Sequence, residues 1–207
     1  MCGRYALHSN PELVALQFGL AQVPRFAPRY NIAPAASALI VKPEGAALAC
    51  WGLKGNRHNA RAETLAVKPA FRHAYHRRRC LVPANGFYEW KREGGLSQPF
   101  YVCPAAGELF AFAGIWEDER FAVITTEANV VVGAIHDRMP VIIAPGQYAG
   151  WLHGDLSTRS LEQGLLRPAP PDAVRVHPVS AAVNRAAQDS PALIAPLESE
   201  VQKGLFD

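Results

Sequence analysis

The sequence predicts an α+β protein in which short strands outnumber short helices, and three observations support this class. The chain has 16 glycines and 17 prolines, 33 of its 207 residues, which is about 16% against an average near 12%. This surplus favours many short elements joined by turns. Apolar residues recur in short runs, and no internal repeat or low-complexity tract is present. We therefore expect one β-rich domain over residues 1–207, with a tail at about 198–207.

The first predicted element is a short helix. Asn10 is typical of an N-cap, Pro11 of a first helical turn and Gly19 of a helix end. Six apolar runs predict strands: Ala38–Val41, Ala47–Leu53, Phe100–Cys103, Leu109–Ile115, Phe121–Thr126 and Val141–Ile143. Further peripheral helices are expected in three segments: Lys68–Arg78, Gly146–Leu152 and Thr158–Leu165.

Two segments indicate turns or linkers. Lys91–Gly95 is a polar turn cluster between apolar runs. Arg167–Asp172, with its three prolines, is the one candidate linker, but it is too short and too near the end to separate two domains.

Composition excludes several classes of protein. Hydrophobic residues make up 49% of the chain and charged residues 19%, which excludes a mainly disordered chain. No apolar stretch approaches the roughly 20 residues of a membrane-spanning helix, and the amino terminus lacks a signal-peptide core. The cysteines at positions 2, 50, 80 and 103 form no C-x-x-C pair, so we expect free thiols in a reducing cytoplasm and neither metal nor cofactor.

The charge is mildly basic and unevenly placed. The net charge is +3 and the pI is near 8.7, which permits nucleic-acid binding without demanding it. Six basic residues fall within eight positions: Arg72, His73, His76, Arg77, Arg78 and Arg79. Taken alone, this run favours a solvated helix face.

Cys2 is the most informative position. If Met1 is removed, Cys2 carries an α-amine and a thiol on adjacent carbons. An α-amine has a pKa of about 7.7–8.0, so an appreciable part is neutral and nucleophilic at neutral pH. The amine of such a 1,2-aminothiol reacts with an aldehyde to give an imine. The thiol then adds to the imine carbon and closes a thiazolidine ring. A cysteine at position 2 can also be accidental, so its partners decide.

The segment Asn59–Thr64 is the first candidate partner. If it is extended, Asn59, Arg61 and Glu63 share one face and two alanines the other. The alternative is an ordinary exposed edge strand.

Glu89 lies in an aromatic run, Gly86–Trp90. Burial among aromatic side chains raises a carboxyl pKa and makes a glutamate a candidate general acid or base. The alternative is a strand with an outward glutamate. Trp90 could also stack on a nucleic-acid base, although single aromatics are more often core residues.

His136 lies in Ile135–Pro140, beside Asp137 and Arg138. An imidazole shuttles protons near neutrality, and an adjacent arginine can hold phosphate. His177–Ser180 is a weaker candidate of the same kind.

These motifs closely resemble, in their order along the chain, the SRAP (SOS response-associated peptidase) family, whose members are abasic-site processing proteins. The resemblance rests on an ordered set of segments: Met1–Arg4, Tyr30–Pro34, Trp51–Leu53, Asn59–Thr64, Arg77–Pro83, Gly86–Trp90, His136–Pro140 and His177–Ser180. It implies a β-barrel-like, mainly antiparallel core with a groove for single-stranded DNA.

The resemblance also implies chemistry and residue roles. Cys2 matches the nucleophile that captures the aldehyde of an abasic site as a thiazolidine DNA–protein crosslink, a lyase-like enzyme reaction. Asn59 matches a positioning residue, Glu89 a proton shuttle, and His136 a residue that assists sugar ring opening and crosslink reversal. The matching DNA-binding positions are six: Arg4, Arg61, Trp90, Arg138, Pro34 and Thr125. The implied partner is single-stranded DNA with abasic sites, bound by a monomer in the cytoplasm or on the nucleoid.

Two alternatives remain. One is an N-terminal-nucleophile cysteine peptidase or amidohydrolase, in which the Cys2 amine serves as base; the family's peptidase label refers to removal of residues preceding the cysteine, here only Met1. The other is a non-covalent single-stranded DNA-binding protein.

One departure from the family is the short loop Lys54–His58, where many members carry more aromatic and proline residues, so the preferred DNA junction can differ.

Overall fold

The computed structural model describes residues 2–106, 109–154 and 164–197. In these residues twelve strands form two sheets, and the larger sheet closes into a barrel. The sequence-predicted tail at 198–207 lies outside these residues. The strands have the following bounds: β1 Tyr5–Leu7, β2 Arg29–Ile32, β3 Ser37–Lys42, β4 Gly45–Trp51, β5 Asn59–Arg61, β6 Arg79–Ala84, β7 Gly86–Glu93, β8 Leu96–Pro104, β9 Phe110–Glu117, β10 Arg120–Glu127, β11 Arg138–Pro140 and β12 Val174–Pro178. The α+β class predicted from the sequence is confirmed.

The larger sheet closes on itself. Its order is β11-β10-β4-β3-β6-β9, and β9 pairs again with β10, so five strands return to their starting point. Most pairs are antiparallel, but β10 runs parallel to both β4 and β5. Closure removes the exposed edges that an open sheet would carry.

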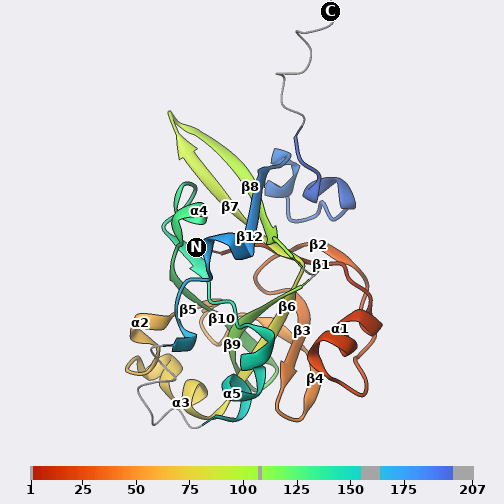
Figure 1. Cartoon of the computed structure of the whole chain (residues 1–207), viewed down its shortest axis with the longest axis vertical. Helices are drawn as coiled ribbons and strands as arrows, with labels where there is room; N and C mark the ends of the chain where they lie inside the picture. Colours follow the sequence, from red (N-terminus) through yellow and green to blue (C-terminus); the bar gives the residue numbers. More distant parts are fainter. Residues whose placement is uncertain (1, 107–108, 155–163, 198–207) are drawn as a thin grey trace, which may run out of the picture.

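The second sheet has the order β12-β8-β7-β1-β2. Its β7–β8 hairpin projects from the barrel, and β12 lies along β8 (Figure 1). The hairpin turns at Gly94 and Gly95, whose positive φ angles of 57° and 80° suit a tight two-residue turn. The turn expected at Lys91–Gly95 is thus shorter, because Lys91, Arg92 and Glu93 continue β7.

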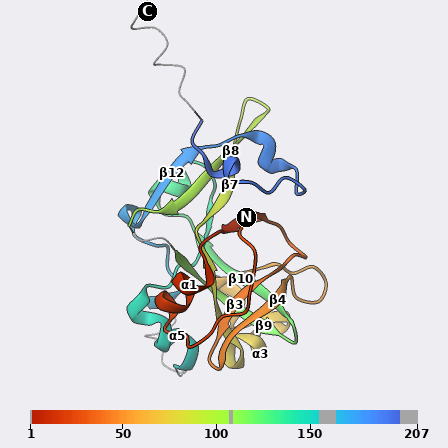
Figure 2. The same ribbon diagram turned by 90° about the vertical axis from the view of Figure 1, so that its right-hand side faces the viewer.

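The helices are short, and those within residues 62–77 and 148–153 cover the barrel end opposite the hairpin (Figure 1), where the turned view also places them (Figure 2). They comprise five α-helices and four 3-10 turns among the described residues: α1 Pro11–Phe18, α2 Ala62–Leu65, α3 Pro69–Arg77, α4 Val130–Gly133, α5 Tyr148–His153, η1 Pro145–Gln147, η2 Pro171–Ala173, η3 Ala181–Asn184 and η4 Pro191–Ile194. No helix in this part of the chain is long and apolar enough to cross a membrane.

The first helix ends where its sequence predicts. The Asn10 side chain accepts a hydrogen bond from the Leu13 amide at 2.8 Å, and Gly19 adopts the left-handed conformation at the C-cap. The helix expected at Lys68–Arg78 appears as α3, and that at Gly146–Leu152 as η1 followed by α5. The helix expected at Thr158–Leu165 falls largely on residues outside the described ones.

The barrel strands bury both faces, which explains their nearly continuous apolar runs. In β10, Phe121 and Val123 belong to the cluster inside the barrel, whereas Ala122 and Ile124 belong to the cluster beneath the helices. This alternation follows from the two-residue repeat of a strand. The inner cluster centres on Trp51, whose ring lies 5.1 Å from that of Tyr5.

Two strand predictions need correction. Val141 and Ile143 are buried, but Val141–Ile143 is not a regular strand, and β11 lies just before it. Its amides and carbonyls bond singly to β9 and β10, with Val141 N donating to Ile124 O at 2.9 Å and Ile143 N to Ala111 O at 2.8 Å. The chain therefore threads between two strands without pairing continuously with either.

The segment Asn59–Thr64 is extended only as far as Arg61. From Ala62 the chain turns into α2, because Ala, Glu and Leu favour helix and Leu65 is fully buried. Glu63 therefore does not continue the row of Asn59 and Arg61 along one strand, contrary to the extended prediction.

Candidate active site

Strand pairing brings Cys2 towards Glu89. β1 and β7 pair antiparallel, with Tyr5 opposite Phe87 and Ala6 opposite Gly86. The pairing continues beyond β1, since the Tyr88 amide donates to Arg4 O at 3.0 Å. Cys2 therefore follows the path of β7 past Tyr88 towards Glu89. Because this approach depends on backbone pairing, the Glu89 charge acts on the Cys2 thiol although 87 positions separate the two residues in the sequence.

Asn59 reaches the same place from the barrel. β5 lies parallel to β10, with Asn59 opposite Val123. The Asn59 Nδ2 atom donates to the Cys2 carbonyl oxygen at 2.7 Å. Its Oδ1 atom is buried and meets no hydrogen-bond donor among the described residues. An amide with one bond made and one acceptor left over is suited to fix Cys2 and to receive a hydroxyl or amine from a ligand.

The Cys2 thiol is fully buried, and burial raises its pKa well above the ordinary value. The negative charge of Glu89 raises the pKa further. Its Sγ atom lies 3.9 Å from the Arg4 carbonyl oxygen. At neutral pH this cysteine is therefore a thiol, so any reaction through sulfur must also move the S–H proton.

Glu89 is 1% exposed, and burial raises its pKa from 4.5 to about 7. A carboxyl group with this pKa exists in both protonation states at neutral pH and can serve as acid or base. The His136 Nε2 atom lies 3.9 Å from Glu89 Oε2. Burial lowers the pKa of His136, so its ring is mainly neutral at pH 7.

The loop between α4 and β11 orients His136. The His136 backbone amide donates to Val132 O at 3.0 Å, and the His136 Nδ1 atom accepts from the Arg138 amide at 3.0 Å. With Nδ1 as acceptor, the neutral ring carries its proton on Nε2, the atom that faces Glu89. Helix α4 in turn begins at Asn129, whose side chain caps it.

An open pocket of about 510 Å³ adjoins this group. Its lining comprises six residues: Glu89, Trp90, Arg92, Ile135, His136 and Asp137. The Trp90 indole is half-buried, and its Nε1 atom donates to Asn184 Oδ1 at 2.7 Å. The tryptophan wall is therefore held in place by η3.

Arg138 is engaged within the protein. Its Nη1 and Nη2 atoms contact the two Glu63 carboxylate oxygens at 2.7 and 3.0 Å, and Nη2 also donates to Thr125 O at 2.7 Å. Thr125 itself is fully buried and offers no surface to a DNA strand in this conformation. In this conformation Thr125 supports Arg138 instead, and its expected DNA contact stays a prediction.

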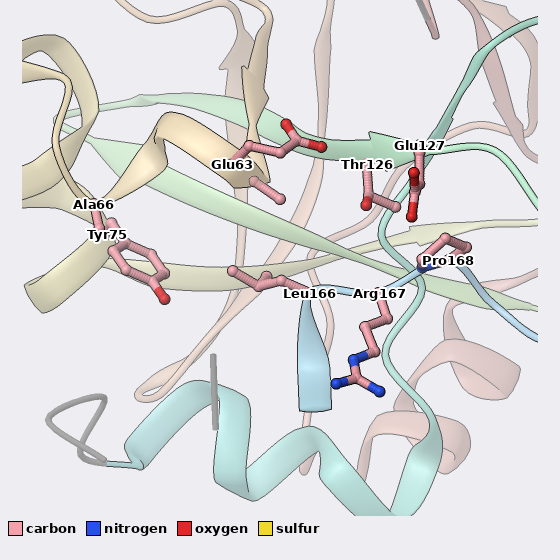
Figure 3. A pocket seen from close by; sticks show the side chains of 9 residues that line it. Glu63, Ala66, Tyr75, Thr126, Glu127, Leu166, Arg167 and Pro168 are labelled. Atoms are coloured by element: carbon pink, nitrogen blue, oxygen red, sulfur yellow. The ribbon is translucent and has the colours of Figure 1, made fainter. Parts of the chain in front are cut away.

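The remaining predicted DNA-binding residues lie at separate positions. Arg61 and Pro34 are exposed, Pro34 in the turn after β2. Arg4 donates to Asn31 Oδ1 at 2.9 Å and to Val183 O at 3.0 Å. A second pocket, of about 430 Å³, is bordered by Glu63, with Thr126 and Glu127 of β10 opposite (Figure 3). None of Cys2, Asn59, Glu89 and His136 lines it.

The role of Asn31 went unrecognised in the sequence. It is fully buried, and its Nδ2 atom reaches the carbonyl oxygens of Val183, Arg185 and Gln188 at 2.8 to 3.2 Å. This side chain therefore ties the segment after β12 to Arg4 and β2. A polar asparagine inside the extended run Tyr30–Ile32 was the available signal, since asparagine is a poor strand former.

The basic residues between 72 and 79 lie in two different environments, one exposed and one buried. Arg72, His73, His76 and Arg77 are exposed on α3, as the solvated-face interpretation predicts. Arg79 is buried and donates to backbone carbonyls near the ends of α3 and α5. Among the described residues, no group of three or more His, Cys, Asp or Glu side chains is arranged to hold a metal ion.

The fold and site define an α+β protein with a buried cysteine near its amino terminus, beside an amide, a carboxyl group and an imidazole. The model of the family described as SOS response associated peptidase (SRAP) matches residues 1–186. The chain therefore belongs to the SRAP family.

Individual relatives agree with this assignment. The chain is 35% identical to "Abasic site processing protein YoqW" of Bacillus subtilis, over 94% of this chain and 99% of that protein. It is 29% identical to "Abasic site processing protein YedK" of Escherichia coli, over 95% and 100% of the two chains. A crystal structure of a Bacteroides thetaiotaomicron protein matches with a TM-score of 0.84 at 23% identity, covering 95% of this chain and all of that one, which supports the fold.

Proposed function

We propose that this protein captures abasic sites in single-stranded DNA by forming a thiazolidine crosslink through Cys2. The observation that carries the proposal is the 2.7 Å hydrogen bond from Asn59 to Cys2, made where the Glu89 charge acts on the Cys2 thiol. A cysteine, a positioning amide and a carboxyl group with a pKa of about 7 thus meet at the start of the chain. The names of the SRAP relatives, abasic site processing proteins, agree with this substrate.

The chemistry requires that Met1 be removed. The freed Cys2 amine attacks the aldehyde carbon of the ring-opened sugar, and the resulting carbinolamine loses water to give an imine. Glu89 in its acid form protonates the departing hydroxyl group. The Cys2 sulfur then adds to the imine carbon, and the S–H proton passes to the imine nitrogen. One aldehyde and one aminothiol thus give one thiazolidine and one water.

The raised pKa of Cys2 suits this order of steps. A buried thiol keeps its proton until the imine forms, so sulfur adds after nitrogen has reacted. Glu89 regains its proton from nitrogen when the neutral imine forms, so it can give that proton to the imine nitrogen and take the S–H proton in its place. His136, 3.9 Å from Glu89, assists opening of the sugar ring.

The DNA strand is held by basic and aromatic side chains in the proposal. Arg4, Arg61 and Arg138 contact phosphates, which makes affinity dependent on salt without reading sequence. Trp90, at the wall of the 510 Å³ pocket, stacks on a base. Pro34 adds apolar contact from its exposed turn, and Thr125 acts through Arg138.

Intact-protein mass spectrometry tests this function. Protein lacking Met1 is mixed with a single-stranded oligonucleotide carrying one abasic site, and a heat-stable mass increase equal to the oligonucleotide minus one water is expected. Cys2→Ala abolishes the adduct. Cys2→Ser retains the amine and forms only an imine, which is trapped by borohydride. Cys103→Ala, a half-buried cysteine on β8, reacts like the natural protein.

The alternatives give different results. Binding of the oligonucleotide without a change of mass indicates a non-covalent single-stranded DNA-binding protein. Turnover of a peptide or amide in the absence of DNA, lost in Cys2→Ala, indicates a cysteine hydrolase.

A further inference from the structure

Asp137 is an exposed neighbour of the His136 ring. Its Oδ1 atom is 3.0 Å from His136 Nδ1, and its side chain is 86% exposed. The His136 side chain is 25% exposed and that of Glu89 only 2%. The three side chains line the same pocket, so exposure falls stepwise from Asp137 to Glu89.

The Nδ1 atom of His136 faces two groups with opposite requirements. The Arg138 amide donates to it at 3.0 Å, which needs a lone pair on Nδ1. The Asp137 carboxylate at 3.0 Å accepts hydrogen bonds only, and so needs a proton on Nδ1. The neutral ring therefore bonds to the Arg138 amide, whereas the protonated ring donates to Asp137. Both ring states have a partner.

The other ring nitrogen faces the buried acid. His136 Nε2 lies 3.9 Å from Glu89 Oε2, beyond a direct hydrogen bond but within reach through one water or a small closure of the site. When the ring takes up a proton at Nδ1, it can therefore release the proton on Nε2 to Glu89. The reverse sequence carries a proton from Glu89 to solvent.

The proposed crosslinking reaction needs such a path. When the Cys2 amine starts as an ammonium group, forming a neutral thiazolidine and water releases one proton. That proton arises beside Glu89, which is almost fully screened from solvent. An exchange route through His136 would return Glu89 to its starting protonation state.

We propose that Asp137 is a positioning residue that stabilises the Nδ1-protonated ring of His136, so that the ring exchanges protons between Glu89 and solvent. This inference rests on the proposed function of the site. The charged groups that act on the ring are Glu89 and Arg92 from β7, Asp137 from its own loop and the amino-terminal ammonium group. Burial lowers the pKa of His136, the amino-terminal charge and Arg92 lower it further, and Asp137 and the Arg138 amide oppose them.

Asp137→Asn tests the inference, with Asp118→Asn as the matched control. Asp118 is an exposed aspartate in the turn between β9 and β10, so the control makes the same charge change away from the pocket. In Asp137→Asn, ¹⁵N NMR of the imidazole is expected to show the pKa of His136 shifted downwards and the Nδ1-protonated form depleted. Asp118→Asn leaves both unchanged, and Asp137→Glu restores the natural behaviour.

Kinetics supply the second readout. At saturating abasic DNA, single-turnover adduct formation by Asp137→Asn is expected to slow about tenfold at neutral pH, with the pH profile displaced in the same direction as the His136 titration. Binding of intact single-stranded DNA does not weaken. An unchanged His136 titration, an unchanged rate, or equal slowing in Asp118→Asn would overturn the inference. If the natural protein forms no adduct at all, the proposed function fails, while the NMR titration still decides whether Asp137 controls the ring.

Discussion

Glu63 holds Arg138 by both terminal nitrogens of its guanidinium group, at 2.7 and 3.0 Å. Thr125 O takes a further donor from Nη2, and Nε is buried with no acceptor among the described residues. Of the five N–H donors of an arginine, one on Nη1 is left for a ligand. Arg138 therefore does not present a free fork to a phosphate in this conformation, and its charge is neutralised by a carboxylate.

Glu63→Gln is expected to strengthen binding of single-stranded DNA. Without the carboxylate, Arg138 can turn both terminal nitrogens to a phosphate. One additional phosphate contact raises affinity a few-fold at low salt and steepens the slope of log K against log salt by about 0.7. Fluorescence anisotropy with an intact oligonucleotide over a series of salt concentrations measures both quantities.

The control is Glu44→Gln, which removes a negative charge from an exposed pair with Lys42. It is expected to change affinity much less than Glu63→Gln, because the gain depends on Arg138 and not on net charge. Weaker binding in Glu63→Gln contradicts the prediction and makes Glu63 the residue that aims Arg138.

Glu89→Gln is expected to stabilise the fold at high pH while abolishing crosslinking. The folded protein keeps a proton on Glu89 up to about pH 7, whereas the unfolded chain releases it near 4.5. Between these values the folded state binds more protons, so the contribution of Glu89 to stability falls as pH rises through the window. The free energy of unfolding of Glu89→Gln relative to that of the natural protein should therefore rise by about 3 kcal/mol between pH 4 and pH 8.

Urea unfolding at several pH values measures this gain, and mass spectrometry measures the adduct. Glu119→Gln, an exposed residue in the turn before β10, should give a flat difference across the same pH range. A pH-independent difference for Glu89→Gln would mean that the carboxyl group is not held in its protonated form by burial.

The parts of this fold that follow from local signals could be predicted from the sequence. Asn10 and Gly19 mark the ends of α1 by hydrogen bonding and left-handed backbone, both local properties. The runs that became β3, β4, β9 and β10 are apolar because both barrel faces are buried, and the run that became β8 buries Tyr101 and Val102 in the second sheet. The composition of β6 hid that strand, since Arg79 and Pro83 are atypical of a barrel strand and it is the pairing with β9 and β3 that makes it one.

The candidate site residues could be named from the sequence, and their catalytic roles stay a prediction, but their contacts could not be predicted. Cys2, Asn59, Glu89 and His136 were each recognisable as reactive side chains. The Glu63–Arg138 pair was not, because Ala62 and Leu65 turn the chain into α2 and so redirect Glu63. The burial of Thr125 could not be predicted either, because it depends on the place of β10 among the strands of the barrel. Contacts between residues far apart in sequence need the pairing of strands to define them.

Gly86→Ala is expected to destabilise the protein by about 1–3 kcal/mol. A Cβ atom at this position would lie 2.5 Å from the Val102 carbonyl oxygen and 2.4 Å from the Tyr101 ring. Both belong to β8, so the β7–β8 pair must shift, and Glu89 lies on the shifted strand. The free energy of unfolding in urea should fall, and adduct formation should slow with it.

The matched control is Gly146→Ala in η1, where an added Cβ meets nothing within 4 Å. It should change the free energy of unfolding by less than about 0.5 kcal/mol. Equal stability of the two variants would show that β8 moves away from Gly86 without cost.

Arg79→Lys is expected to lower the free energy of unfolding by about 2–3 kcal/mol. The buried Arg79 guanidinium joins two helix ends, with Nη1 donating to Tyr75 O at 3.1 Å and Nη2 to Gly154 O at 2.6 Å. A lysine keeps the charge, but its single nitrogen cannot span both groups of carbonyls. Urea unfolding measures the loss. Arg77→Lys, exposed on α3, should cost less than about 0.5 kcal/mol. Because Arg79 is buried, DNA affinity per folded molecule should not change; a fall in affinity at full folding would place Arg79 in the DNA interface instead.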